Sequence, residues 1–138
     1  MTSLAPCWSS RQALAQQHWP QRCRRCAALG LRYALGEEWI ELEGGPAFPF
    51  QRPRLADELM ADALKAGAAD LPYWSELWES GVALAGLVWR RRGALAGRRA
   101  VELGCGLGLV SLVAALAGLR IVATDKEPEA LAFARCNA

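Results

Sequence analysis

A glycine-rich turn is the feature of this sequence best suited to chemistry. Gly104, Gly106 and Gly108 follow a short apolar segment and precede a segment dense in Leu, Val and Ala. Glycine lets a backbone approach a ligand closely, and a helix that begins there aims its first amides at the ligand. Asp125, at the end of the next apolar segment, comes 21 positions after Gly104, where a carboxylate can bind ribose hydroxyls. We therefore predict a site for an adenosine-containing cofactor.

The spacing of the glycines separates the possible cofactors. A dinucleotide fingerprint, G-x-G-x-x-G, would place its third glycine at position 109, but that residue is Leu109 and the pattern is G-x-G-x-G. A Walker loop is excluded because no Lys-Ser or Lys-Thr follows the glycines. Glu102, two residues before Gly104, adds a carboxylate that can receive an ammonium group and would repel a pyrophosphate. No catalytic acid, base or nucleophile is assigned.

Alternating strands and helices must position this turn. We predict strands over residues 100–103 and 121–124, and helices over 109–117 and from Pro128 onward. This order predicts an α/β fold with a Rossmann-like parallel sheet. Two parallel strands cannot bury both faces of a sheet, so we expect the sequence to be an incomplete domain, with only the first two core strands.

Three regions are predicted along the chain. Residues 1–36, with five Arg and no acidic residue, form a poorly ordered or targeting-like extension. Residues 37–70 contain a strand over 38–43, a turn, an extended segment over 48–53 and a helix over 55–66 that Gly67 ends. Residues 71–138 form the first half of the cofactor-binding domain, including a helix over 80–89 that Gly93 ends.

Length and composition restrict the classes of function. The chain has 138 residues, of which 53% are apolar and 22% charged, typical of one soluble globular domain. Its formal charge of +2 is small for a protein that grips nucleic acid through phosphates, and the run Arg90-Arg91-Arg92 is expected to be a solvated helix end. The uncharged run 103–119 is shorter than the roughly 20 residues of a membrane-spanning helix. Neither nucleic acid nor a membrane is expected as a partner.

The cysteines indicate a reducing compartment. Their number is odd and no apolar signal-peptide core precedes them, which favours free thiols: they are Cys7, Cys23, Cys26, Cys105 and Cys136. The lone C-x-x-C at 23–26 fits no zinc spacing, so no metal site is predicted. We expect the protein in the cytoplasm, or in mitochondria if residues 1–36 are a transit segment.

Residues 101–108, Val-Glu-Leu-Gly-Cys-Gly-Leu-Gly, resemble motif I of the class I, seven-stranded methyltransferases that use S-adenosylmethionine. Asp125 matches the acidic residue that follows the second strand of that family. The resemblance implies S-adenosyl-L-methionine as the cofactor. It implies that Glu102 and the three glycines, with Cys105 between them, hold its methionine end, and that Asp125 holds its ribose.

A second stretch narrows the resemblance. Residues 71–81, followed by Ala83-Leu84-Ala85, are similar to the entry segment of the methyltransferase 16 group, which includes protein-lysine methyltransferases such as those acting on the electron-transfer flavoprotein beta subunit. In that group a tryptophan six residues before a Leu-Ala pair lines the cofactor pocket, and Trp78 holds this position. Trp78 could instead pack in the core, and either role is expected to bury its ring. Trp74 faces the same cleft or packs in the core.

The resemblance implies N-methylation of a lysine on a protein substrate. Two alternatives stay open: N-methylation of a small-molecule amine such as a nicotinamide-like pyridine, and a catalytically inactive fragment that only binds the cofactor. In this group the residues around the adenine and the target amine follow later strands. No acceptor site is therefore assigned.

Overall fold

The computed structural model describes residues 29–138, which form two small sheets and the helices between them. Strands β1 (Leu35–Glu41) and β2 (Ala47–Pro53) pair antiparallel as a hairpin. Strands β3 (Arg99–Leu103) and β4 (Arg120–Thr124) pair parallel. The chain therefore has the mixed α/β architecture that the sequence predicts.

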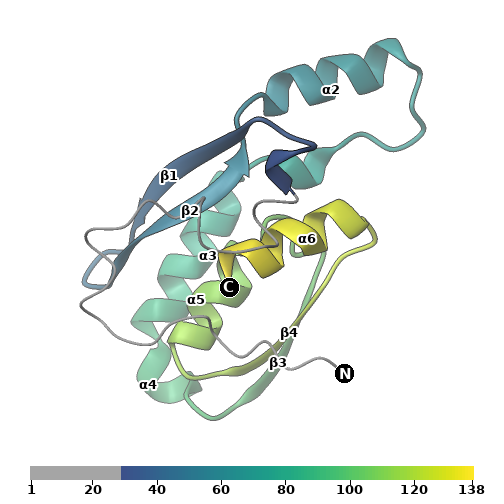
Figure 1. The fold of residues 1–138 in the computed structure, drawn as a ribbon. Helices are drawn as coiled ribbons and strands as arrows, with labels where there is room; N and C mark the ends of the chain where they lie inside the picture. Colours follow the sequence, from purple (N-terminus) through teal and green to yellow (C-terminus); the bar gives the residue numbers. More distant parts are fainter. Residues whose placement is uncertain (1–28) are drawn as a thin grey trace.

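Helices connect these strands, and some of them pack between the two sheets. The helical elements are α2 (Ala56–Lys65), the 3-10 turn η2 (Tyr73–Ser75), α3 (Glu79–Arg90), α4 (Arg92–Leu95), α5 (Leu109–Leu116) and α6 (Pro128–Asn137). Helix α3 packs against α5, α5 against β4, and α6 against β2. Helices α5 and α6 thus lie between the hairpin and the β3–β4 sheet (Figure 1).

The predicted strand–helix–strand–helix order is confirmed, with each strand starting one residue earlier than expected. Helix α5 provides the crossover that two parallel strands require. Gly118, with a φ of +87°, ends the helical segment as predicted. The register runs from Arg99 opposite Arg120 to Leu103 opposite Thr124, which brings the carboxyl ends of both strands to one edge. The glycine turn and Asp125 follow at that edge.

The predicted N-terminal strand, turn and extended segment form the hairpin. Its turn uses Gly44 at a φ of +62°. Gly45 lies so close to α3 that an added Cβ would be 2.4 Å from Nε1 of Trp89. Phe48 and Phe50 of β2 are fully buried in the core cluster with residues of α3, α5 and α6. The hairpin therefore covers the helical layer.

The helix end predicted at Gly93 is wrong. Helix α3 ends at Arg90, and the short helix α4 runs through Gly93 to Leu95. Gly97, at a φ of +77°, is the glycine in the left-handed conformation, whereas Gly93 does not have a positive φ. Gly93 is thus an ordinary helical residue. By contrast Gly67, with a φ of +63°, ends α2 as predicted.

Two apolar surfaces remain open in the described part of the chain. On the outer face of the β3–β4 sheet, Val101, Leu103 and Val122 are exposed, Leu103 by 81%. This is the exposure expected of a parallel sheet with two strands. On α2 only Ala56 is buried, and Leu64 is 60% exposed, so the predicted apolar face of that helix is mostly uncovered.

Several expectations concern cysteines and membranes. Cys105 is a free thiol, but Cys136 is disulfide-bonded, so the expectation of free thiols is wrong for Cys136. The C-x-x-C motif and most of the predicted extension lie outside the described residues. Within residues 29–138 no helix is long and apolar enough to cross a membrane, and no cluster of His, Cys, Asp and Glu could hold a metal ion.

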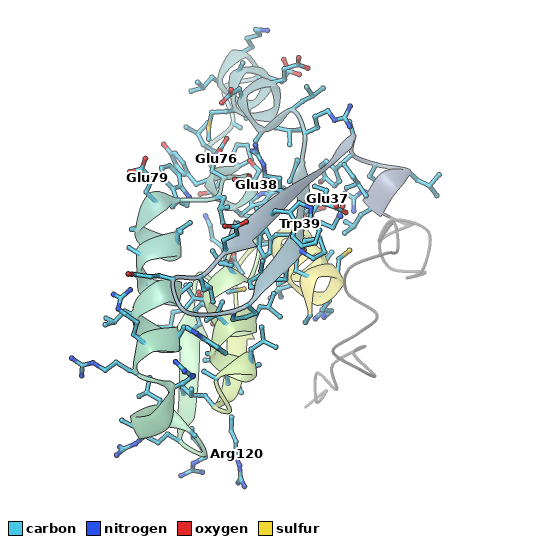
Figure 2. All side chains as sticks on the ribbon, turned by 90° about the vertical axis from the view of Figure 1, so that its left-hand side faces the viewer. Glu37, Glu38, Trp39, Glu76, Glu79 and Arg120 are labelled. Atoms are coloured by element: carbon cyan, nitrogen blue, oxygen red, sulfur yellow. The ribbon has the colours of Figure 1, made fainter. Side chains whose placement is uncertain are left out.

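Charge is divided between two ends of the molecule. Figure 2 shows Arg120 at the lower end and, in the upper half, the acidic side chains Glu37, Glu38, Glu76 and Glu79. From Ser80 to Thr124 the chain carries six arginines and a single acidic residue, Glu102. The acidic end is therefore the one at which positively charged groups are attracted.

Candidate cofactor site

The glycine turn connects β3 to α5 with a backbone that requires glycine. Gly104, Gly106 and Gly108 have φ values of +67°, +52° and +87°. Residues with a Cβ are strained in this left-handed region. The alternation of glycines in the sequence is thus explained by the turn itself.

The three glycines differ in what surrounds them. A Cβ added at Gly104 would meet no atom within 4 Å, so this residue borders open space. At Gly106 the nearest atom would be the carbonyl oxygen of Trp74, 3.4 Å away, and at Gly108 it would be the Cβ of Ala134, only 2.7 Å away. Gly104 therefore leaves room for a ligand, whereas Gly108 makes room for α6.

Hydrogen bonds within the chain hold the turn against β4. The amide of Cys105 donates to the carbonyl of Thr124 at 2.9 Å, and the amide of Gly106 donates to Oδ2 of Asp125 at 2.8 Å. The amide of Gly108 donates to the carbonyl of Cys105 at 2.8 Å. These three amides are already bound, so the turn offers a ligand open space more than free donors.

Asp125 is fixed at the edge of the sheet by two backbone donors. Besides the Gly106 amide, the amide of Glu127 donates to its Oδ1 at 3.0 Å. A carboxylate has about four acceptor positions, so lone pairs remain for hydroxyl groups of a ligand. The predicted ribose-binding residue is thus held rigidly beside the turn.

Glu102 lies within the same site. It is the second-last residue of β3, just before the glycine turn. The hydroxyl of Ser111, on α5, donates to its Oε2. Burial raises the pKa of Glu102, the hydrogen bonds from Ser111 lower it, and the negative charge of Asp125 raises it. The two carboxylates are therefore close enough to interact electrostatically, and a cation between them would be stabilised by both.

Cys105 contributes through its backbone. Its side chain is buried, and burial, together with Glu102 and Asp125, raises the pKa of the thiol to about 11. The thiol is therefore neutral at physiological pH. Cys105 belongs to the predicted motif without offering a reactive group.

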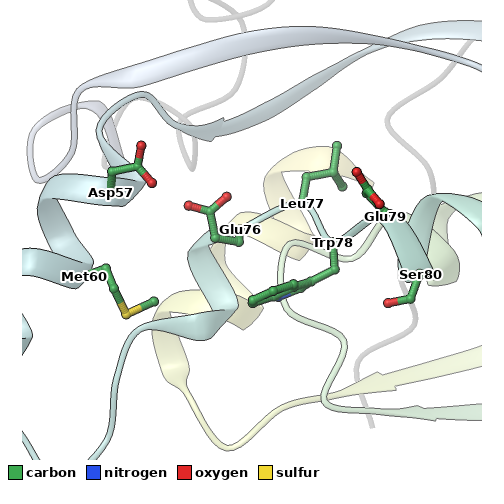
Figure 3. A pocket seen from close by; sticks show the side chains of 7 residues that line it. All are labelled: Asp57, Met60, Glu76, Leu77, Trp78, Glu79 and Ser80. Atoms are coloured by element: carbon green, nitrogen blue, oxygen red, sulfur yellow. The ribbon is translucent and has the colours of Figure 1, made fainter.

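Trp78 lies at the surface, beside the start of α3. It lines a separate cavity of about 550 Å³ with the residues shown in Figure 3: Asp57, Met60, Glu76, Leu77, Glu79 and Ser80. Its ring is 52% exposed and its Nε1 donates to the carbonyl of Tyr73 at 3.0 Å. The expectation of a buried ring is wrong, because the cavity that Trp78 lines at the start of α3 is open to solvent.

Trp74 is partly buried and packs against the core. Its ring lies 5.9 Å from that of Tyr33 and 5.7 Å from that of Phe133, between ring centroids. Its carbonyl oxygen faces Gly106, as described above. The segment before α3 therefore covers the glycine turn with its backbone, and Trp74 fixes that segment to α6.

Two residues of the site were missed by the sequence reasoning. Ser111 donates a hydrogen bond to Glu102. The sequence feature that could have revealed this role is that Ser111 is the one hydroxyl-bearing residue in the apolar sequence of α5. The hydroxyl of Thr124 donates to the carbonyl of Glu102 at 2.8 Å, and nothing in the sequence distinguished it from an ordinary strand residue. The roles of both residues can be recognised only when the relative positions of β3, β4 and α5 are known.

The chain is an α/β protein with a glycine-rich turn between two carboxylates, those of Glu102 and Asp125. Comparison with known sequences indicates the class of protein to which it is related. No family profile matches the chain. It is 43% identical over 61 residues to protein N-lysine methyltransferase METTL21A of Danio rerio, a match covering 44% of this chain and 28% of that protein. It is 37% identical over 67 residues to the electron transfer flavoprotein beta subunit lysine methyltransferase of Danio rerio, covering 48% of this chain and 26% of that protein.

These matches cover about a quarter of each curated relative. They support the methyltransferase family as the class of protein to which the site is related. Within that class, both relatives are named as lysine methyltransferases.

Proposed function

We propose that this chain is part of a methyltransferase with a Rossmann-like fold that transfers a methyl group from S-adenosylmethionine to a protein lysine. The observation that carries the proposal is the open space at Gly104, flanked by the carboxylates of Glu102 and Asp125 at one sheet edge. Similarity to two lysine methyltransferases supports it.

The residues of the site fit this cofactor in charge and shape. Glu102 would receive the ammonium of the methionine end, and Asp125 would accept hydrogen bonds from the ribose hydroxyls. Gly104 would let the backbone approach the ligand closely. When bound, S-adenosylmethionine supplies an electrophilic methyl group.

The protein's share of such a reaction is to bind, orient and exclude water. Transfer of a methyl group needs in-line positioning more than an acid–base pair. A lysine nucleophile must be neutral, which a desolvated position favours by lowering its pKa. No residue of this chain is therefore required as a general base.

The cavity beside Trp78 favours a basic protein segment over an uncharged small molecule as the substrate. Three carboxylates line it, those of Asp57, Glu76 and Glu79, and this end of the molecule is acidic (Figure 2). Carboxylates attract a basic segment of a protein, and an exposed indole ring can stack on a cationic side chain. Trp78 would then contact the acceptor, the cofactor or both.

The first test is cofactor binding and methyl transfer by the full-length protein. S-adenosylhomocysteine binding is measured by calorimetry, and transfer of a labelled methyl group is measured on lysine-containing protein and on nicotinamide. Gly104→Arg should fill the open space and Asp125→Ala should remove the ribose acceptor, so both should abolish binding and transfer. The matched controls are Gly97→Arg, at an exposed glycine that also has a positive φ and open space around an added Cβ, and Asp62→Ala, at an exposed position on α2.

The possible results separate the candidates. Transfer to protein lysine that both site variants abolish supports the proposal. Transfer to nicotinamide but not to protein lysine would show that the acceptor is a small-molecule amine. Binding without transfer would favour the inactive cofactor-binding protein, and full activity in both site variants would reject the site. We propose a cytoplasmic location, with mitochondria as the alternative.

A further inference from the structure

Ser111 is a buried hydroxyl in an otherwise apolar helix. Helix α5 has the sequence Leu-Val-Ser-Leu-Val-Ala-Ala-Leu, and Ser111 is 6% exposed. A buried hydroxyl destabilises the fold unless it is hydrogen-bonded. The hydroxyl donates to Oε2 of Glu102, so its partner is a group that is charged when ionised and the bond is then charge-assisted.

The carboxylate of Glu102 has few other supports. Among the described residues no other side chain donates a hydrogen bond to it, and it forms no ion pair. The groups that surround it are unfavourable to its charge: Asp125 is negative and the thiol of Cys105 is neutral. Without the hydroxyl of Ser111, the carboxylate would keep only the hydrogen bond from the backbone amide of the same residue.

The position of Ser111 in the helix makes the contact possible. It lies in the first turn of α5, directly after the glycine turn, and α5 packs against β4, the strand paired with β3, which carries Glu102. The hydrogen bond joins residues 9 positions apart on two different elements. It therefore fixes the carboxylate relative to the open space at Gly104.

We propose that Ser111 is a positioning residue that orients Glu102 to receive the ammonium group of the cofactor's methionine end. The inference rests on the proposed function and adds a basis for specificity. A correctly aimed carboxylate distinguishes ligands with the α-ammonium, such as S-adenosylhomocysteine, from the truncated nucleoside methylthioadenosine, which lacks it. Ser111 acts through Glu102 and does not itself touch the ligand.

The test compares binding of these two compounds by calorimetry, using the full-length protein. Ser111→Ala should weaken S-adenosylhomocysteine about tenfold, the loss expected of a misplaced charge-assisted hydrogen bond, and leave methylthioadenosine within about twofold. Ser111→Thr, which keeps the hydroxyl, should bind S-adenosylhomocysteine with most of the wild-type affinity. Ser75→Ala is the matched control, because Ser75 is also buried but donates to the carbonyl of Pro72.

A second measurement needs no cofactor. A carboxyl titration of Glu102 by NMR should show a higher pKa in Ser111→Ala than in the wild type, because the hydrogen bond from the Ser111 hydroxyl is gone and only the one from its backbone amide remains. Ser75→Ala should leave that titration unchanged.

The outcomes are distinguishable. Selective weakening of the ammonium-bearing ligand, with the shifted titration, supports the role of Ser111. Equal weakening of both ligands, or no weakening, overturns it while leaving the proposed function in place. If the wild type binds neither compound, the proposed function fails, and the inference fails with it.

Discussion

The side chain of Asn137 forms hydrogen bonds with both the backbone amide and the backbone carbonyl of Gln51, as a neighbouring strand would. Its Oδ1 accepts a hydrogen bond from the Gln51 amide at 2.7 Å, and its Nδ2 donates to the Gln51 carbonyl at 3.0 Å. The same Nδ2 also donates to the carbonyl of Leu107, in the glycine turn, at 3.0 Å. Both Asn137 and Gln51 are buried. One amide thus joins the hairpin, α6 and the candidate cofactor site.

Asn137→Ala should therefore destabilise the protein strongly. It leaves the buried amide and carbonyl of Gln51 unpaired, and each unpaired group costs about 1–3 kcal/mol. We expect the free energy of unfolding to fall by about 2–4 kcal/mol in urea titrations. Asn137→Asp should also destabilise, because it removes both donated hydrogen bonds and buries a charge. A loss below about 0.5 kcal/mol in both variants would contradict this role.

Glu102→Gln should stabilise the protein at neutral pH while weakening cofactor binding. Burial raises the pKa of Glu102, so the folded state holds this proton more tightly than the unfolded state. The wild type is then most stable below the unfolded pKa and loses that contribution as the pH rises through the folded pKa. The glutamine variant does not ionise and lacks this loss.

Thermal melts of both proteins between pH 4 and pH 8 check this sign. The difference in melting temperature should grow in favour of Glu102→Gln as the pH rises and then become constant. Glu38→Gln, at a residue of β1 that forms an ion pair with Arg52, serves as a control for loss of a carboxylate. A wild type more stable than Glu102→Gln at pH 8 would show that the carboxylate is not destabilised by burial.

The thiol of Cys105 should react slowly with alkylating reagents. The thiolate is the reactive form of a cysteine. Because burial raises the pKa of this thiol to about 11, only about one molecule in a thousand carries the thiolate at pH 8. Mass spectrometry after iodoacetamide treatment should show Cys105 modified far more slowly in native than in urea-unfolded protein. The native rate should keep rising with pH above 9. Rapid native labelling at pH 7 would disprove the buried, neutral thiol.

Gly108→Ala should cost more stability than Gly104→Ala. Both residues have positive φ values, so each substitution adds backbone strain of about 1–2 kcal/mol. At Gly108 the new Cβ would also lie 2.7 Å from that of Ala134, whereas at Gly104 it meets no atom. Differential scanning calorimetry measures the two losses. Ala134→Gly should recover part of the loss in Gly108→Ala, and equal losses for the two glycine variants would contradict the packing explanation.

The turn and its flanking elements could be predicted from the sequence because their causes are local. Gly104 must be glycine for its own φ, and the apolar segments on either side of the turn have the lengths of a strand and a helix. Asp125 follows the second strand, and parallel pairing necessarily brings it to the turn. These features need no knowledge of distant parts of the chain.

The remaining features depend on contacts between distant elements. Trp74 and Trp78 are four residues apart with the same side chain, and the path of the backbone before α3 decides which of them packs against the core. Gly93 and Gly97 both fit a helix end, and the start of β3 decides between them. The pairing of Asn137 with Gln51 spans 86 positions, which no local pattern encodes.

That long separation has a consequence for synthesis. A ribosome releases the hairpin, with Phe48 and Phe50, well before it has made Asn137. During this interval the aromatic side chains of β2 lack the α6 residues that cover them in the finished protein, among them Phe133. Until α6 has been made, the aromatic side chains of the hairpin therefore stay partly exposed to solvent in the nascent chain.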